Sequence, residues 1–133
     1  MYKDVHLATA VGIVSLLTSM DAGAHHSAAM FDEQKSVTVP GTVRLFQWTN
    51  PHCWIQMLVS GPGEPTEWSI ELGSPAQLYN KGWKPGTLKA GDKIVVVIHP
   101  LRDGTNGGVF VSATDAAGNP LVAASASGGI PER

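Results

Sequence analysis

The chain has 133 residues and a formal net charge of −2 at pH 7, which suits one domain with a modest core and leaves no room for a second. This near-neutral balance offers no basic surface for phosphates and argues against a nucleic-acid partner, while the single cysteine excludes an internal disulfide. The 15 glycines, 9 prolines and 43% hydrophobic residues are typical of a turn-rich β protein.

The amino terminus resembles a targeting segment. Lys3 precedes an apolar run from Leu7 to Leu17, which is shorter than the roughly 20 residues needed to span a bilayer. Ala22-Gly23-Ala24 then supplies an A-x-A cleavage site. We therefore predict a signal peptide over residues 1–24 of a bacterial periplasmic or secreted protein, with no membrane insertion after cleavage. An uncleaved membrane anchor is the alternative.

Cleavage after Ala24 would make His25 the first residue, followed by His26. An amino-terminal histidine offers its α-amine and a ring nitrogen to one ion, and such nitrogens suit Cu(II), Ni(II) or Zn(II). Cleavage one residue earlier would make His26 the third residue of the mature chain, an arrangement that also suits Cu(II). The alternative is that both histidines are polar residues of a frayed terminus.

The first strand is predicted over residues 36–48, after a linker over 28–35 in which Met30 and Phe31 pack against the core. Its apolar residues alternate and then change parity, which indicates a bulge near Leu45. Pro40-Gly41 indicates a coiled strand that serves two parts of a sheet.

A tight turn follows at Asn50-Pro51, and it places His52 at the mouth of a hairpin. The second strand is predicted over 52–59 and the third over 66–72. In the third strand Trp68 is expected to point inward, and Glu67 and Glu71 to point to water.

One short helix is predicted from Ser74, its N-cap, to Asn80, with Trp83 packed beneath it. A buried strand over 93–99, a glycine-rich loop over 100–108 and a fifth strand over 109–114 complete the domain. The segment 123–133 is predicted to be a flexible tail.

This order of elements predicts an all-β protein with one short helix, folded over residues 25–122 as an OB-like five-stranded Greek-key barrel. The bent first strand, shared between two neighbours, supports that topology. Because periodicity does not determine how a sheet closes, a small β-sandwich is the alternative.

The chain also resembles a family of exported bacterial proteins that is catalogued as a domain of unknown function. The resemblance covers nearly the whole mature chain, and it implies export and a compact β domain but no activity. Cys53 departs from the pattern, so no site is built on it. The matching segments are His25-His26-Ser27, Met30-Phe31-Asp32, Gly41-Thr42-Val43, Trp48-Thr49-Asn50-Pro51-His52, Trp68-Ser69-Ile70-Glu71, Gly82-Trp83, Gly91-Asp92 and His99-Pro100-Leu101-Arg102-Asp103-Gly104.

Four histidines would remain after processing, and they are the candidate metal ligands. OB topology is expected to place His52 and His99 at opposite ends of the barrel, so we predict a site of His25, His26 and one of these two. His99 is preferred because the first strand begins beside it. Asp103, in the loop that follows, is expected to complete the ligand set or to hold an imidazole in position. The alternative is that His52 and His99 are structural.

The sequence thus predicts an exported binding module that holds a transition metal, and copper is the preferred candidate. The alternative is a module for a protein partner or a small apolar ligand, with Trp48 and Trp54 lining an apolar pocket. No enzyme signature appears, so the sequence favours a binding protein over an enzyme. A copper-dependent oxidase is the second alternative, and nothing in the sequence identifies a protein partner.

Overall fold

The computed structural model describes residues 28–122. The predicted signal peptide, His25, His26 and the predicted tail over 123–133 lie outside these residues. A short 3-10 helix, η1 (Ala28–Met30), opens the described part of the chain. Five strands and one α-helix follow: β1 (Val37–Gln47), β2 (Trp54–Val59), β3 (Thr66–Glu71), α1 (Pro75–Asn80), β4 (Lys93–Pro100) and β5 (Gly107–Asp115).

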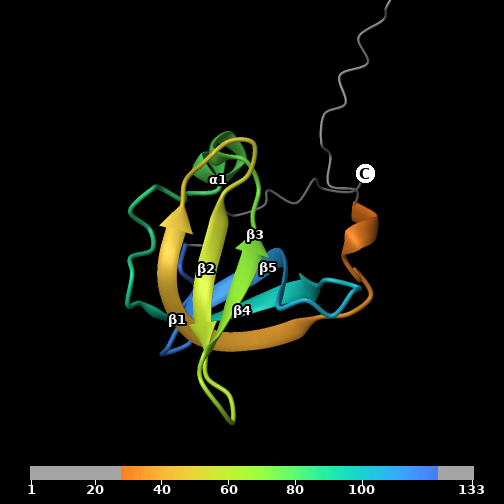
Figure 1. Cartoon of the computed structure of the whole chain (residues 1–133). Coiled ribbons are helices and arrows are strands. Elements are labelled where there is room, and N and C mark those ends of the chain that lie inside the picture. Colours follow the sequence, from red (N-terminus) through yellow and green to blue (C-terminus); the bar gives the residue numbers. More distant parts are fainter. Residues whose placement is uncertain (1–27, 123–133) are drawn as a thin grey trace, which may run out of the picture.

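The strands form a closed barrel in the order β1-β2-β3-β5-β4 (Figure 1). All neighbouring pairs are antiparallel except β3 and β5, which are parallel. This is the topology of the predicted OB-like barrel. The sheet closes on itself, so the β-sandwich alternative is excluded.

Strand β1 is long and bent, as the sequence predicted. Its first half pairs with β4 and its second half with β2, and the register shifts between Val43 and Leu45. Gly41 lies at the bend, where a Cβ atom would meet the carbonyl oxygen of Leu58 at 2.8 Å. The close passage of the two backbones therefore needs glycine at this position.

Strand β5 begins two residues earlier than predicted. Gly107 and Gly108, which the sequence assigned to a loop, pair in parallel with Ser69 and Ile70 of β3 and close the barrel. A Cβ atom on Gly108 would collide with the carbonyl oxygen of His99. Glycine here is required by close packing of backbones, a role that local sequence does not distinguish from a turn.

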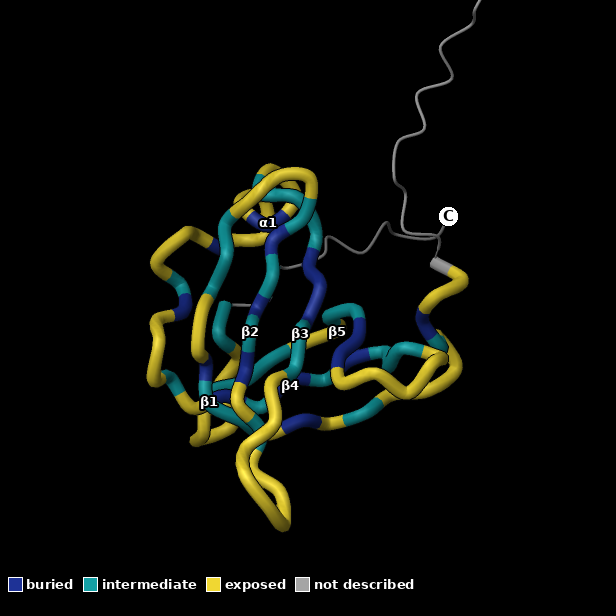
Figure 2. The backbone as a smooth tube through the Cα atoms, viewed as in Figure 1, coloured by how far each residue is buried: buried dark blue, intermediate teal, exposed yellow. Residues whose placement is uncertain are grey.

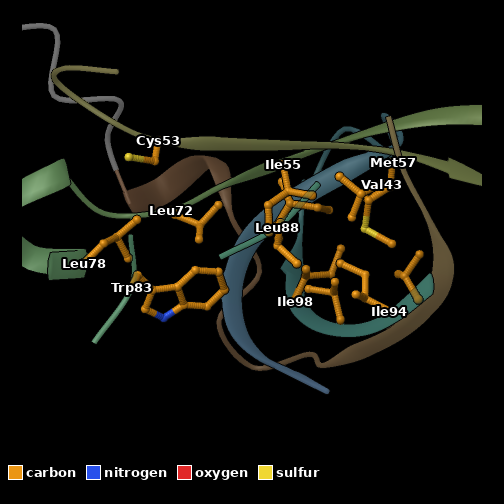
Figure 3. Packing of buried hydrophobic residues seen from close by; sticks show 13 residues of the cluster. Val43, Cys53, Ile55, Met57, Leu72, Leu78, Trp83, Leu88, Ile94 and Ile98 are labelled. Atoms are coloured by element: carbon orange, nitrogen blue, oxygen red, sulfur yellow. The ribbon is translucent and has the colours of Figure 1, made fainter. Parts of the chain in front are cut away.

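The core fills the barrel and continues under α1 (Figures 2 and 3). Leu72, Leu78 and Trp83 gather at one end of the cluster, and Val43, Met57 and Ile94 at the other (Figure 3). Helix α1 begins in a capping box between Ser74 and Gln77. The predicted place of Trp83 beneath the helix is confirmed, since it is buried and its backbone N–H donates to Leu78.

Paired residues form one row across four strands of the barrel. Trp54 on β2 pairs with Glu71 on β3, Glu71 with Val109 on β5, and Val109 with His99 on β4. His52, two residues before Trp54, therefore lies near the same row as His99, about three strand spacings or roughly 14 Å away along the sheet. Along β1, Trp54 pairs with Gln47 and Ile98 with Val37, at the two ends of that strand. Because the strands of a closed barrel tilt relative to its axis, a row of paired residues also climbs along the axis, so this row does not contradict the prediction that the two histidines lie toward opposite ends.

Within residues 28–122, none of the helices has the length and apolar character needed to cross a membrane.

Candidate functional site

Residues 28–35, here called the N-terminal strap, run along the end of β4 and the loop that follows it. The backbone N–H of Asp32 donates to the carbonyl of Pro100 at 2.8 Å, and Phe31 forms a bridge with Leu101. The carbonyl of Met30 accepts a hydrogen bond from the backbone N–H of Arg102 at 2.9 Å. These bonds fix the strap against the outside of the barrel, where it is seen beside the β4–β5 loop (Figure 1).

The strap builds a small pocket on the outer face of β3. Phe31 is buried as predicted, but Met30 is 43% exposed. Together with Leu101 these side chains lie over Trp54 and Glu71 and enclose a cavity of about 110 Å³. The remaining walls come from Ser69 and Gly108.

Glu71 is the residue that the sequence placed incorrectly. It shares the outer face of β3 with Glu67, and Glu67 is exposed as predicted, bound to Arg44 at 2.7 Å. Glu71, however, is only 6% exposed. The strap covers this end of the face, so the alternation of β3 does not determine which of its outward residues meets solvent.

The buried carboxylate of Glu71 holds His52. Nδ1 of His52 donates to Oε1 of Glu71, because an ionised carboxylate can only accept. A neutral ring then carries its lone pair on Nε2, for which no interaction is found within residues 28–122. The His52 side chain is 34% exposed, so Nε2 is available to a metal ion or a proton at the surface.

His99 is held differently. Its Nδ1 lies 2.7 Å from the carbonyl oxygen of Lys35, which can only accept, so this nitrogen also carries the hydrogen. Oδ1 of Asp103 accepts from the backbone N–H of Thr105 at 2.9 Å, and hydrogen bonds from Thr105 lower the pKa of Asp103. The structure thus places Asp103 in a local turn and shows no bond between it and His99.

The two tryptophans that flank the turn have separate roles. Trp54 lines the pocket beneath the strap. Trp48 packs edge-on against Phe46, with ring centroids 5.8 Å apart. Cys53 is fully buried, and this burial raises the pKa of its thiol, so it behaves as the small core residue that the sequence indicated.

The strap runs antiparallel to residues 99–102. The carbonyl of Lys35 lies at Nδ1 of His99, the backbone N–H of Asp32 donates to Pro100, and the carbonyl of Met30 accepts from Arg102. Met30 also lines the pocket with Trp54 and Glu71, and His52 is not among the described residues that line it. Residues 28–122 contain no group of three His, Cys, Asp or Glu side chains placed to share a metal ion.

The contact between His52 and Glu71 was missed, although the sequence carries a signal for it. In a β-hairpin the start of one strand opposes the end of the next, so the turn over residues 60–65 pairs Trp54 with Glu71. His52, just before β2, is then within reach of a carboxylate at the end of β3. What the sequence did not show is that the strap would bury this carboxylate.

Comparison with known proteins shows the family to which the chain belongs. Residues 13–111 match the model of a family of unknown function, DUF6152. The chain belongs to this family. The predicted membership of a family of unknown function is therefore confirmed, and the DUF6152 match reaches from before the strap into β5.

No protein with a curated description matches this DUF6152 chain. Among solved structures, one similar chain is the mitochondrial single-stranded DNA binding protein Rim1 from S. cerevisiae, with 11% sequence identity and a TM-score of 0.48. That match covers 64% of this chain and 95% of Rim1.

Proposed function

We propose that this DUF6152 protein is an exported OB-barrel module that binds Cu(II) through His25, His26 and His52. The observation that carries the proposal is the contact between His52 and the buried carboxylate of Glu71. Metal-binding histidines commonly donate their second ring N–H to a carboxylate, which sets the tautomer and orients the ring. Glu71 gives His52 this arrangement and leaves Nε2 without a partner among the described residues.

The tether supports the choice of partners. His25 lies three positions before Ala28, and at roughly 3.3–3.6 Å per residue this length of chain reaches about 10 Å from the amino-terminal end of the strap. Met30, two residues after Ala28, lines the same cavity as Trp54 and Glu71, and Glu71 contacts His52. We therefore favour His52 as the third ligand, in place of the His99 preferred from sequence.

The test is a calorimetric titration of the exported protein with Cu(II), after mass spectrometry has established its amino terminus. We expect one ion per chain with a dissociation constant below about 1 µM. His52→Gln should weaken binding at least about tenfold while still offering Glu71 a donor. His99→Gln is the matched control and should bind as the wild type does.

Two results would contradict the proposal. One is a mature chain that begins well away from His25. The other is wild-type binding no tighter than about 1 µM, or equal losses in the two histidine variants.

A second candidate function is the binding of a small apolar ligand, which the cavity of about 110 Å³ beside Trp54 favours. In that case Trp54→Ala would abolish ligand capture, and His25→Ala with His26→Ala would leave it unchanged. A panel of small apolar probes, followed by the fluorescence of the tryptophans, distinguishes this function from copper binding.

A further inference from the structure

We propose that the cavity beneath the N-terminal strap binds a small apolar primary amine, whose ammonium group lies against the carboxylate of Glu71. This inference names the class of ligand for the second candidate function, on which it rests. It does not depend on copper or on the amino terminus.

The cavity combines apolar walls with one charged side chain. The apolar walls come from Met30, Phe31, Trp54 and Leu101. Glu71 is the one ionisable side chain among the described residues that line the cavity. A volume of about 110 Å³ is well below that of a site for a drug-sized molecule, so the ligand is small.

The register of the sheet brings the polar side chains of the cavity together. Ser69 and Glu71 are two residues apart on β3, so their side chains share the outer face of the barrel. Trp54 is the partner of Glu71 on β2. Two oxygen-bearing side chains therefore lie beside the apolar walls, on strands that hold them in place.

Both of these side chains present hydrogen-bond acceptors. Oγ of Ser69 donates its hydrogen to Oε1 of Gln56 at 2.5 Å, so only the lone pairs of Ser69 remain for a ligand. The ionised carboxylate of Glu71 can only accept. An ammonium group is the complementary partner, because it has three N–H donors and no acceptor.

The charge of Glu71 points to the same ligand. Glu67, on the same face of β3, pairs with Arg44, whereas no lysine or arginine of residues 28–122 pairs with Glu71. His52 contacts Glu71, but a neutral imidazole supplies a hydrogen bond and no positive charge. A buried carboxylate is stabilised by a paired cation, which an ammonium ligand would supply.

The experiment is an NMR titration of the metal-free protein, with a chelator present, using n-butylammonium and n-butanol. The two probes have nearly the same size and shape, and only the first is charged. We expect n-butylammonium to bind with a dissociation constant below about 1 mM, and n-butanol to bind at least about tenfold more weakly.

Substitution of the carboxylate tests which group recognises the charge. Glu71→Gln should lower the affinity for n-butylammonium at least about tenfold and change that for n-butanol less than about twofold. Glu67→Gln is the matched control and should alter neither affinity. The comparison of the two probes on the wild type holds whether or not the Glu71 variant folds.

The outcomes separate this inference from the function on which it rests. If both probes bind equally, or if Glu71→Gln binds n-butylammonium like the wild type, the cavity is an apolar site and only this inference fails. If neither probe binds at millimolar concentration, the second candidate function fails with it. An equal loss of affinity in Glu67→Gln would show a general effect of charge on β3, which also overturns the inference.

Discussion

At the scale of single residues, the pair formed by His52 and Glu71 sets the chemistry of the site. A buried carboxylate is unfavourable unless it is paired, and His52 is the partner that the structure provides. The same contact fixes the imidazole tautomer. One interaction therefore serves both the stability of the barrel and the orientation of a possible ligand.

Replacing Glu71 by glutamine tests this double role. Glu71→Gln keeps the shape but removes the charge, so we expect the free energy of unfolding to fall by about 1–2 kcal/mol. Cu(II) affinity should fall about 10–100-fold because His52 loses the carboxylate that orients it. Urea unfolding and calorimetry measure the two effects. Glu67→Gln, on the same face of β3, is the control, and it should change stability by less than about 1 kcal/mol because its pair with Arg44 is exposed.

At the scale of elements, the parallel contact between β3 and β5 closes the barrel and depends on glycine. Gly108 passes so close to β4 that a Cβ atom would collide with the His99 carbonyl and approach Cδ1 of Ile98 at 2.9 Å. Both neighbours are held in a packed strand, so they have little room to move.

We therefore expect Gly108→Ala to lower the free energy of unfolding by about 1–3 kcal/mol through overpacking. Gly61→Ala, in the turn between β2 and β3, is the control, since a Cβ atom there meets nothing within 4 Å. Its effect should stay within about 0.5 kcal/mol. Equal effects of the two substitutions in urea unfolding would show that β5 does not pack against β4 as described.

The N-terminal strap is the second element on which the stability of the fold and the proposed site depend. Phe31 is buried between the strap and the barrel, so Phe31→Ala should destabilise the fold by about 3 kcal/mol. It should also weaken Cu(II) binding, because water would then reach Glu71 and loosen its hold on His52. Urea unfolding and copper titration of the same preparation check both effects. Unchanged copper affinity together with the full loss of stability would show that the strap is structural only.

At the scale of the whole molecule, three aspartates, of which Asp103 is exposed and Asp32 and Asp115 are partly buried, make the stability of the fold depend on pH. Hydrogen bonding by Lys35 lowers the pKa of Asp32, Asn119 lowers that of Asp115, and Thr105 lowers that of Asp103. A lowered pKa in the folded state means that the unfolded chain takes up more protons as the pH falls. The contribution of these groups is present above the ordinary value of about 3.8 and is lost as the pH falls through the lower folded values.

We expect the melting temperature to be steady between pH 6 and 5 and to fall steeply below about pH 4. Asp32→Asn and Asp115→Asn should each start from a lower melting temperature and show a shallower fall. Calorimetric scans between pH 6 and 2 measure the slopes. Slopes identical to that of the wild type would contradict the assignment.

Most of the fold could be predicted from the sequence, because it depends on local patterns. Alternation defined the strands, Ser74-Pro75 defined the start of α1, and the change of parity near Leu45 defined the bulge. The errors came from contacts between distant segments. The burial of Glu71 depends on the strap about 40 residues earlier in the chain, and the early start of β5 depends on a parallel pairing with β3 that no local pattern reports.

Only part of the candidate site could be predicted, because some of its contacts also join distant segments of the chain. His52 was identified from its place at a turn between two tryptophans, a local feature. The burial of its carboxylate partner, Glu71, depends on how the strap lies beside β3, which becomes visible only in three dimensions.

The central claim is that His52, oriented by Glu71, is a copper ligand together with the processed amino terminus. An anomalous difference map at the copper edge, from crystals of the copper-loaded exported protein, tests it most directly. We predict one strong peak about 2 Å from Nε2 of His52, with further density leading to His25 or His26. A peak on His99 with none on His52, or no ordered copper in crystals of a protein that retains copper in solution, would contradict the claim.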